Sequence, residues 1–470
     1  MLKNHVFNQL CANLKHTPTA SQTELIVALS EFIIDKNDSR IFVVSGFAGT
    51  GKTSSISALV TTLKSLKIKS VLLAPTGRAA KVLTSYSETT AYTIHKKIYR
   101  QKSANDGLGK FTLDRNIHTD TIFIVDEASM ISNTSAEQSI FGSGRLLDDL
   151  VEFVRAGKSC RLILVGDRAQ LPPVGIEQSP ALSEHELRCF GDTQKISLND
   201  VVRQAADSEI LSNANLLRLN IDNNCIQMPK FKFSSNIDVE LISSAEVVEK
   251  IGSAYDKYGF ENTSVISYSN RRANRYNQGI RTFIFGREEE LVIGDLLMVV
   301  KNCYQFVDNN ADIDFIANGD IAEVVHIGKY EQRYGFRFAN VRLCFHDYND
   351  TEISCKIMLD TLAIESASLS YDDSRKLYAA IAEDYAHITN KRKLYAAIRE
   401  DMYFNALQVK YSYAITCHKA QGGQWQAVFL DKLFLKEPIT ISDLRWLYTA
   451  FTRASEKLFL IDFDKKYLEN

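Results

Sequence analysis

The sequence lacks three features that would point to a specialised class of protein. It has no excess of charge, because 55 Lys and Arg residues are balanced by 57 Asp and Glu residues among 470, a formal net charge of −2. Composition alone therefore does not predict a nucleic-acid-binding protein, and a surface that contacts phosphates has to be a local patch. No stretch reaches the ~20 apolar residues of a membrane span, and the N-terminus lacks the apolar run of a signal peptide. We expect a soluble, cytoplasmic protein without membrane contact.

Paired cysteines are also missing. The eight cysteines are scattered, with no Cys-x-x-Cys pair and no histidine cluster at the spacing of metal ligands. We interpret them as reduced thiols of a cytosolic protein. The remaining composition, 45% hydrophobic and 24% charged, is that of an ordinary globular chain, and its length predicts roughly two to four domains.

Four short apolar runs in the first part of the chain have the pattern of strands in a parallel sheet. Each ends in a loop that contains Gly, Asp or Pro, and a helical pattern follows. The runs are Ile41–Ser45, Ser70–Ala74, Thr121–Val125 and Arg161–Val165. Functional residues are expected just after their carboxyl ends.

The same pattern resumes after about residue 195 and predicts a second α/β sheet, from segments that begin at Lys195, Thr263, Val409 and Ala427. Between about residues 288 and 408, longer alternating strands indicate a small β-barrel-like insertion that ends in a helical stretch. We therefore expect a first domain at 1–195, a second domain at 196–287 and 409–470, and the insertion at 288–408.

The helical stretch contains an internal repeat with a period of 17 residues, Arg375–Ile381 and Arg392–Ile398. Two copies are too few for a solenoid. We interpret them as two short, similar helices and assign them no chemistry.

The first strand is followed by the pattern GxxxxGK[ST], in the strand-then-helix context that a phosphate-binding loop requires. Glycines let backbone N–H groups approach phosphate oxygens, Lys52 supplies a charge for the β and γ phosphates, and the Thr53 hydroxyl can ligate Mg²⁺. The alternative is a plain strand-to-helix turn. The predicted ATP-binding residues are Gly46, Phe47, Ala48, Gly49, Thr50, Gly51, Lys52 and Thr53.

Two adjacent carboxylates, Asp126 and Glu127, follow the strand Thr121–Val125. Downstream of a phosphate loop, this position suits one carboxylate that holds the metal and a second that activates the attacking water. Asp126 is the candidate Mg²⁺ ligand and Glu127 the candidate base. An exposed acidic pair on a solvated face is the alternative.

The segment from Ala91 to Asp120 interrupts the α/β pattern with two polar and aromatic arms around Asn105-Asp106-Gly107, a strong hairpin-turn signal. It contains six Lys and Arg residues against three Asp residues. A basic β-hairpin inserted at about 91–120 is therefore predicted.

Taken in order, further segments resemble motifs Ia, Ib, III, IV, V and VI of superfamily 1B helicases, with RecD-like and Dda-like proteins as the most similar in appearance. The resemblance extends from about Gln22 to Arg453, and the conjunction of motifs is far more specific than any one of them. The segments are Ala74–Ala80, Thr93–Lys96, Gly166–Val174, Val201–Gln204, Ile415–Gly422 and Tyr448–Ala454.

This resemblance implies roles at the nucleotide. Gln22 resembles a glutamine that reads adenine, and Gln170 one that senses the γ-phosphate; a common Gln near a helix start is the alternative for Gln22. Arg203 and Arg453 resemble arginines that reach the transferred phosphoryl group from a second domain. A guanidinium delivered in this way stabilises transition-state charge only when the domains close. A surface salt bridge is the alternative for each arginine.

The resemblance also implies contacts with nucleic acid, since hydroxyls, backbone N–H groups and cations at strand and helix ends can bind the phosphates of one strand. Plain helix caps are the alternative for the threonines. In relatives, the hairpin position holds a separation pin, with Tyr99 and Phe111 as stacking candidates; a solvated hairpin is the alternative. The candidates are Pro75, Thr76, Arg78, Thr93, His95, Tyr99, Phe111, Pro173, Thr416, His418 and Lys419.

The fold implied by the resemblance is two RecA-like P-loop domains, with a β-hairpin pin in the first and a small SH3-like barrel plus helices in the second. The implied function is an ATP- and Mg²⁺-dependent DNA helicase that moves 5′→3′ on single-stranded DNA, acts on forks as a monomer, and serves DNA repair or recombination. Two alternatives stay open: a superfamily 1 RNA helicase, and a nucleotide-switched DNA-binding subunit without unwinding. The acid pair and both arginines favour turnover, and no recruiting protein is identified.

Overall fold

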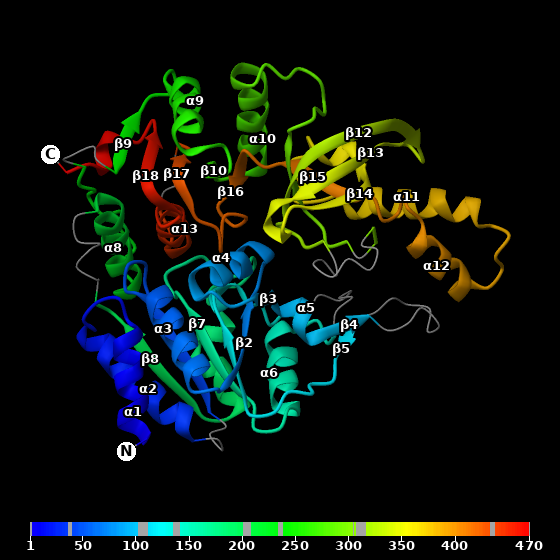
Figure 1. The fold of residues 1–470 in the computed structure, drawn as a ribbon. Coiled ribbons are helices and arrows are strands. Elements are labelled where there is room, and N and C mark those ends of the chain that lie inside the picture. The colour runs from blue at the N-terminus through cyan, green and yellow to red at the C-terminus, as the bar shows by residue number, and fades with distance from the viewer. Residues whose placement is uncertain are drawn as a thin grey trace.

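The apolar runs near the N-terminus form the centre of a six-stranded parallel sheet in the computed structural model (Figure 1). The structure describes residues 2–35, 40–101, 111–134, 142–200, 208–233, 238–303, 305–306, 316–432 and 438–469. In spatial order the strands are β3 (Ala91–Thr93), β2 (Lys69–Ala74), β6 (Thr121–Val125), β7 (Arg161–Gly166), β1 (Ile41–Gly46) and β8 (Thr193–Leu198). Every residue of β1, β6 and β7 is buried, which explains why these strands are continuous apolar runs.

Helices cover both faces of this sheet, and each face has its own apolar core. One core packs α1 (Leu2–Asn13), α2 (Ala20–Ile34), α3 (Lys52–Ser65) and α4 (Gly77–Ser87). The other packs α5 (Ile94–Ile98), α6 (Leu146–Ala156) and α7 (Glu184–Leu187). This two-sided arrangement is that of a RecA-like α/β domain, as the sequence predicts.

The second sheet has five parallel strands in the order β16 (Ala414–Thr416), β10 (Thr263–Ser267), β17 (Trp425–Leu430), β18 (Ala454–Ile461) and β9 (Val239–Ile242). Its helices are α8 (Glu209–Asp222), α9 (Val247–Tyr258), α10 (Asn270–Gly279) and α13 (Ile441–Phe451). Figure 1 shows this sheet above the first, with α4 between them. The prediction of two α/β domains is confirmed.

The insertion is a closed barrel of β11 (Leu296–Val299), β12 (Ile321–Arg333), β13 (Phe336–Phe345), β14 (Thr351–Met358) and β15 (Leu407–Tyr411). β14 and β15 pair in parallel, and the other neighbours are antiparallel. The two repeat copies lie in α11 (Tyr371–Asp384) and α12 (Lys391–Glu400), which project from the barrel (Figure 1).

Two segments that were predicted as strands of the second sheet lie wholly or partly elsewhere. The segment from Lys195 falls in β8, which pairs with β1 in the first sheet, because Ile196 and Leu198 complete the first domain's core. The segment from Val409 contributes its first part to the barrel and its last part to the second sheet. The domain boundaries otherwise stay predictions.

The predicted hairpin has antiparallel arms, β4 (Tyr99–Gln101) and β5 (Phe111–Leu113). Its turn, residues 102–110, lies outside the described residues. Short 3-10 and π segments complete the fold: η2 (Ala128–Met130), η3 (Pro180–Leu182), η4 (Arg188–Phe190), η6 (Ile280–Ile284), η7 (His346–Tyr348), η8 (Leu359–Thr361) and η9 (Lys465–Tyr467).

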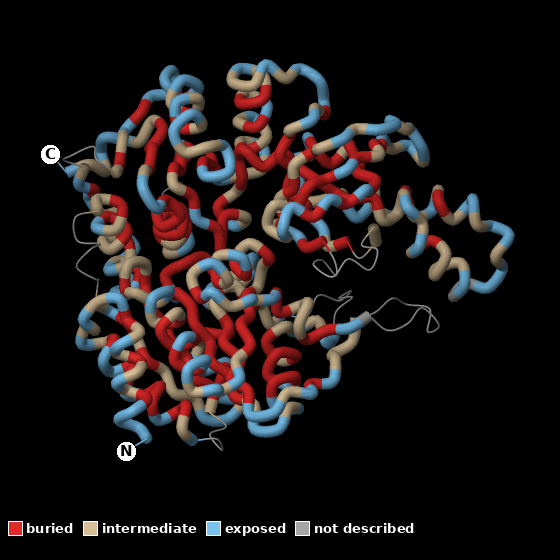
Figure 2. The backbone as a smooth tube through the Cα atoms, viewed as in Figure 1, coloured by how far each residue is buried: buried red, intermediate tan, exposed pale blue. Residues whose placement is uncertain are grey.

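Buried residues follow the strands of both sheets and the barrel, while the outer helix surfaces are exposed (Figure 2). In the described part of the chain, every helix is too short or too polar to cross a bilayer. One core cluster crosses between domains: Phe47, Ala169 and Leu171 of the first domain pack into the apolar core of the second. These residues come from loops at the carboxyl ends of β1 and β7.

Candidate nucleotide site and nucleic-acid interface

Three neighbouring strands, β6, β7 and β1, carry the predicted nucleotide-binding residues directly after their carboxyl ends. The acid pair follows β6, the Gly-Asp motif follows β7, and the phosphate loop follows β1. Because the strands are parallel and adjacent, segments far apart in the sequence meet at one edge of the sheet.

The phosphate loop has the backbone that its glycines allow. Gly49 and Gly51 have φ angles of +76° and +81°, in the left-handed region that favours glycine, and α3 begins at Lys52. A Cβ atom at Gly46 would lie 2.9 Å from Cγ of Lys52, so the loop leaves no room for a side chain there. Gly51 offers no side chain to cap α3, which leaves the first-turn N–H groups for an anion.

The Lys52 ammonium lies folded over this loop. Its Nζ donates hydrogen bonds to the carbonyl oxygens of Gly46 and Phe47, both at 2.8 Å, and lies 3.7 Å from Oδ2 of Asp167. The positive charge is thus held where the sequence predicts the phosphates of ATP.

Gln22 lies under the loop and is buried. Its Oε1 accepts a hydrogen bond from the N–H of Thr19 in a capping box, and its Nε2 donates to the carbonyl of Thr50 at 3.1 Å. One end of the amide therefore caps α2, and the other braces the phosphate loop. Its predicted role in reading adenine would require these bonds to rearrange.

The Asp126 and Glu127 carboxyls are half-buried and share one environment. Desolvation raises the pKa of Asp126, against the hydrogen bonds from the hydroxyl of Tyr86 and the N–H of Glu127 and the charge of Lys52. Desolvation also raises the pKa of Glu127, while the charge of Arg453 opposes the rise. A base with a raised pKa holds a transferred proton more readily.

The backbone at Glu127 is unusual for a residue with a side chain, with a φ of +51°. Non-glycine residues in this region are uncommon and cluster at functional sites. Asp126 and Glu127 directly follow a buried strand, and in this conformation both residues remain partly exposed.

Oxygen ligands of the type that Mg²⁺ prefers are present at the predicted positions. The Thr53 hydroxyl is exposed at the start of α3, and Asp126 follows β6, two strands from β1. Two buried polar atoms nearby, Oε1 of Gln170 and Oγ of Ser129, have no hydrogen-bond partner within the described part of the chain. Such orphaned atoms fit a site built for a polar ligand.

A cavity of about 330 Å³ lies beside these atoms. Asp167, Gln170 and Ser129 line it from the first domain, and Asp222 and Arg445 line it from the second. The predicted γ-phosphate sensor Gln170 therefore lies at the boundary between the two domains.

Tyr448 connects the domains at the nucleotide loop. This fully buried residue of α13 donates a hydrogen bond to Oδ2 of Asp167 at 2.6 Å and accepts one from the N–H of Ala48 at 2.7 Å. Sequence reasoning assigned no role to Tyr448 or Asp167, although both lie in the quoted motifs. A tyrosine within the Tyr-Thr-Ala-Phe-Thr-Arg segment was the available signal.

Leu171, one residue after Gln170, is held by the second domain through both of its backbone groups. Its N–H donates to Oγ1 of Thr449 at 2.9 Å, and its carbonyl accepts from Nε2 of Gln421 at 2.5 Å. A shift of the second domain therefore acts directly on the loop that carries Gln170.

Arg453 is buried at the end of α13. Its guanidinium donates to the carbonyls of Thr449 and Gly423 and to the hydroxyl of Thr452, and its charge opposes the rise in the pKa of Glu127 that desolvation causes. Its guanidinium is thus held by its own domain, and its predicted reach to the transferred phosphoryl group stays a prediction. The other predicted arginine, Arg203, lies outside the described residues.

The predicted nucleic-acid-binding residues also follow parallel strands. Ala74 and Thr93 are partners in the β2–β3 register, which brings Thr76 and the α5 motif to one edge, and Thr416 ends β16 in the second sheet. Thr76 and Thr93 both cap helices, since their Oγ1 atoms accept from the N–H groups of Ala79 and Lys96. Thr93 is also buried, so the cap explains its presence without a phosphate contact.

Contacts across the domain boundary join motif Ia to the loop after β16. A Cβ atom at Gly422 would meet Cβ of Ala79 at 2.9 Å, and the Arg78 guanidinium lies 3.9 Å from the ring centre of Trp425. Desolvation lowers the pKa of Arg78 to about 10, so it stays charged at neutral pH.

Desolvation reduces the positive charge that the other basic candidates carry near neutral pH. Desolvation lowers the pKa of His95 to about 4 and also lowers that of His418. His95 is therefore neutral at pH 7, so it would contact a phosphate through an N–H group and not through a charge, and its place among the nucleic-acid-binding residues stays a prediction. Lys419, whose Nζ contacts Oδ1 of Asn318 in the barrel, has a pKa lowered by desolvation to about 8.

Tyr99 does not present its ring for stacking. It is buried in the first domain's core, and its hydroxyl donates to Oδ2 of Asp149 at 2.6 Å, because the base of the hairpin packs on α6. Phe111 on the opposite arm is half-buried against the same core. Pro75 and Pro173 are partly exposed beside their motifs.

Comparison with known proteins gives two family matches, in the order of the two sheets. The family model described as an AAA domain matches residues 20–228, and that of the UvrD-like helicase C-terminal domain matches residues 411–461. Together they cover the phosphate loop, the acid pair, and the loops that contain Gln421 and Tyr448.

The chain also resembles curated proteins and solved structures. The chain is 32% identical over 179 residues to the ATP-dependent RecD2 DNA helicase of Deinococcus radiodurans, which is 37% of this chain and 21% of that protein. It is 23% identical over 465 residues to the RecD subunit of the RecBCD enzyme of Buchnera aphidicola, 91% of this chain and 70% of that subunit. The Pif1 helicase from Bacteroides in complex with ADP-AlF3 and ssDNA covers 97% of this chain with 95% of its own, at 15% identity and a TM-score of 0.48.

The phosphate loop, acid pair and Gly-Asp motif lie on three adjacent strands, and Tyr448 and Arg453 lie in the second sheet domain. Together with the two family matches, they show that the chain resembles the superfamily 1B helicases of the RecD type, with an AAA domain at 20–228 and a UvrD-like helicase C-terminal domain at 411–461.

Proposed function

We propose that this protein is an ATP-dependent DNA helicase that couples ATP hydrolysis to movement of two RecA-like domains along single-stranded DNA. The carrying observation is the Tyr448 hydroxyl, which joins the phosphate loop and Asp167 of one domain to α13 of the other. DNA as the substrate rests on what the relatives are named for.

Within this proposal each residue of the nucleotide site has a task. The ammonium of Lys52 leaves the Gly46 and Phe47 carbonyls for the β and γ phosphates, and Gln170 directs its unpaired Oε1 toward the attacking water. Glu127 accepts a proton from that water, since desolvation raises its pKa. Arg453 and Arg203 stabilise the charge that spreads over the transferred phosphoryl group.

Thr53 and Asp126 are the groups that would hold Mg²⁺. When bound, the ion supplies positive charge at the β and γ phosphate oxygens. The hydroxyl of Tyr86 keeps the Asp126 carboxylate oriented through its hydrogen bond.

Coupling follows from the shared contacts. Phosphate binding at the loop competes for the N–H of Ala48, which now donates to Tyr448. Loss of that bond frees Tyr448 and α13 from the phosphate loop. The Leu171 backbone then transmits a shift of the second domain to Gln170. The two domains are thus biased toward different separations with and without nucleotide.

The DNA track would run over α4, the loop after β16 and the adjacent barrel, where Arg78 and Lys419 supply the charge. Such contacts are independent of base sequence. Movement in the 5′→3′ direction, action as a monomer, a role in repair or recombination and a cytoplasmic location stay predictions.

Unwinding of tailed duplexes tests this function. We expect ATP-dependent separation of DNA duplexes with a 5′ tail, and none with only a 3′ tail. Equal separation of RNA duplexes would favour an RNA helicase. ATP-dependent changes in DNA affinity without any separation would favour a nucleotide-switched binding subunit and contradict the proposal.

The hairpin is proposed as the wedge that separates the strands. Replacing residues 102–110 with a short Gly-Ser turn should leave the DNA-stimulated ATPase intact, because the nucleotide site is untouched, and should sharply reduce unwinding. A shortened variant that unwinds at the parental rate would contradict the wedge. In that case the barrel becomes the candidate.

A further inference from the structure

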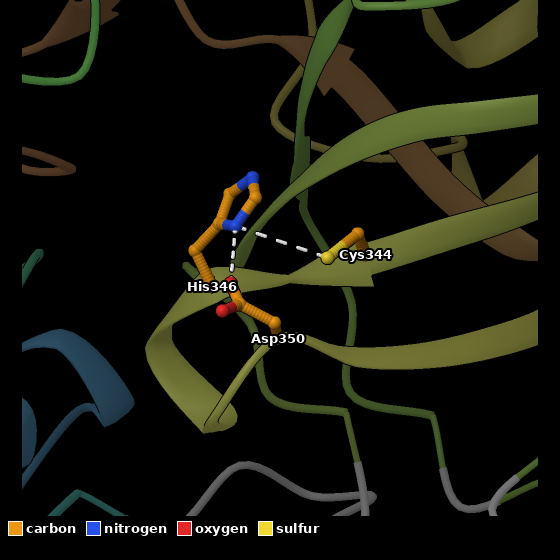
Figure 3. Close-up of side chains that lie close together, drawn as sticks. All are labelled: Cys344, His346 and Asp350. Atoms are coloured by element: carbon orange, nitrogen blue, oxygen red, sulfur yellow. Dashed lines mark hydrogen bonds and ion pairs between the residues drawn. The ribbon is translucent and has the colours of Figure 1, made fainter.

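One end of the barrel carries three side chains of types that ligate metals, outside the nucleotide site. Cys344 lies near the end of β13, His346 begins η7, and Asp350 lies in the turn before β14. Sγ of Cys344, Nδ1 of His346 and a carboxylate oxygen of Asp350 all lie within 4.8 Å of one another (Figure 3).

The cluster converges on one atom. Nδ1 of His346 lies 3.8 Å from Sγ of Cys344 and 2.7 Å from Oδ1 of Asp350. One imidazole nitrogen has a single hydrogen-bonding position, so it cannot serve both partners. A nucleophilic Cys-His-Asp triad would place the thiol and the carboxylate on opposite nitrogens. A bound cation could instead accept the sulfur, nitrogen and oxygen atoms together as its ligands.

The distances suit zinc. Bond lengths of about 2.3 Å to sulfur and about 2.0 Å to nitrogen at a tetrahedral angle imply a sulfur–nitrogen separation of about 3.5 Å. The observed value is 3.8 Å. The corresponding nitrogen–oxygen separation is about 3.3 Å, so the Asp350 carboxylate has to move outward. Its side chain is 75% exposed and therefore has room to do so.

The far side of the imidazole is already fixed. Nε2 of His346 pairs with Oε2 of Glu323 at 3.0 Å, and Glu323 is the β12 register partner of Cys344. A carboxylate on the outer nitrogen sets the tautomer that leaves the inner nitrogen for a metal. The pairing of β12 with β13 thus places Glu323 beside the His346 ring, on the side away from the proposed metal.

We propose that Cys344, His346 and Asp350 bind one zinc ion, with Glu323 as a positioning residue for the His346 ring. A thiolate, an imidazole and a carboxylate form a donor set that zinc accepts, and three protein ligands leave a fourth position for water. The spacing Cys-x-His-x-x-x-Asp differs from that of paired Cys-x-x-Cys motifs, which explains why no metal site was predicted from the sequence. This site goes beyond the proposed helicase activity.

The ion would clamp a turn that contacts the first domain. Within that turn, Asp347 pairs with Nζ of Lys81 on α4 at 2.5 Å, and the Tyr348 hydroxyl donates to Asp320 at 3.0 Å. A Cβ atom at Gly77 would lie 2.5 Å from that hydroxyl, so the turn packs directly on the start of α4. Zinc would therefore stabilise the contact between the barrel and motif Ia.

The test is a titration of the full-length chain, stripped with a chelator, with Zn²⁺ against a chromophoric competitor. Cys189→Ser and Cys225→Ser are introduced first, because these two thiols are exposed. We expect one tight equivalent, and a thiolate-to-metal absorption band when Co²⁺ replaces Zn²⁺. His346→Gln and Asp350→Asn should weaken binding by at least about 100-fold, and Glu323→Gln by about 10- to 100-fold.

Cys344→Ser should remove the Co²⁺ band. His326→Gln, on the same strand as Glu323 but outside the cluster, is the matched control and should leave the affinity unchanged. Hydrogen exchange in residues 345–351 should slow when zinc is added to the parent.

Asp350→Asn is the variant least able to impair folding, since Asp350 is exposed, so it tests the site even if a substitution of a buried ligand unfolds the chain. Parental affinity in Asp350→Asn or Cys344→Ser, or no tight binding at all, would overturn the proposal. Neither outcome depends on ATP turnover.

Discussion

The nucleotide site and the proposed DNA track both lie where loops of the two sheets meet. They differ in how their basic side chains are hydrogen-bonded and desolvated. At the nucleotide site, Lys52 is held by two carbonyl oxygens, and the hydroxyl of Tyr448 in the second domain bonds two groups of the first. Along the track, desolvation leaves His95 neutral and lowers the pKa of Lys419 to about 8. Interlocked hydrogen bonds therefore define the first region, whereas the second depends on a few partly desolvated cations.

The difference teaches that counting basic residues overestimates a DNA-binding surface. A buried cation costs free energy unless an anion pairs with it, and a phosphate is such an anion. The track should consequently respond to pH and salt, while the nucleotide site should respond to the loss of single hydrogen bonds.

The largest effect is expected at Glu127. Glu127→Gln keeps the size and polarity of the side chain but removes the base, so turnover should fall by about 10²- to 10⁴-fold while ATP still binds. Single-turnover hydrolysis and nucleotide-binding measurements check this. Equal losses of ATP affinity and turnover would instead indicate a structural role.

Tyr448→Phe should have the next largest effect. Removing the hydroxyl leaves a buried Asp167 oxygen and the N–H of Ala48 without this partner, which costs about 1–3 kcal/mol and corresponds to about 5- to 150-fold in DNA-stimulated turnover. Tyr255→Phe is the matched control, because the buried Tyr255 hydroxyl has no hydrogen-bond partner among the described residues. The control should keep parental turnover. Parental turnover in Tyr448→Phe would remove the proposed coupling.

DNA binding should weaken as pH rises through about 8. Phosphates favour protonated Lys419, whose pKa is about 8, so its contribution is present below that pH and is lost above it. Lys410 has a similar pKa, but its side chain is buried and donates to the carbonyl of Ile364.

Lys419→Arg should abolish most of this pH dependence, because the guanidinium stays charged. In the parent, deprotonation of Lys419 at pH 9 removes one phosphate contact and should also reduce the salt dependence of binding to single strands by about 0.7. Fluorescence anisotropy at pH 7 and pH 9 measures both. An unchanged pH dependence in Lys419→Arg would place the titrating group elsewhere.

The smallest effect separates a helix cap from a phosphate contact. Thr93→Ala should lower the free energy of unfolding by about 0.5–2 kcal/mol through loss of the α5 cap, and DNA affinity should hardly change because Thr93 is buried. Denaturant unfolding and DNA titration check this. Thr93→Ser keeps the capping hydroxyl and should restore stability. A large loss of DNA affinity in the alanine variant would restore the predicted phosphate contact.

Local pattern was sufficient to predict the phosphate loop, the acid pair, four strands of the first sheet and the arms of the hairpin. Each depends on neighbours in the chain: buried parallel strands are apolar throughout, and left-handed backbone at Gly49 and Gly51 favours glycine. The placement of β8 in the first sheet could not be predicted in this way, because a strand's partner depends on contacts distant in sequence.

The sequence by itself determined which chemical groups this protein has for ATP, since a phosphate loop and a carboxylate after a buried strand are local motifs. Tertiary structure alone decided how those groups are used. It placed Tyr448 on Asp167 across two domains, buried Tyr99 and Thr93, and gathered Cys344, His346 and Asp350 at one end of the barrel. The physical reason is that hydrogen bonding and desolvation depend on which surfaces meet, and two sheets and a barrel can meet only after the chain has folded.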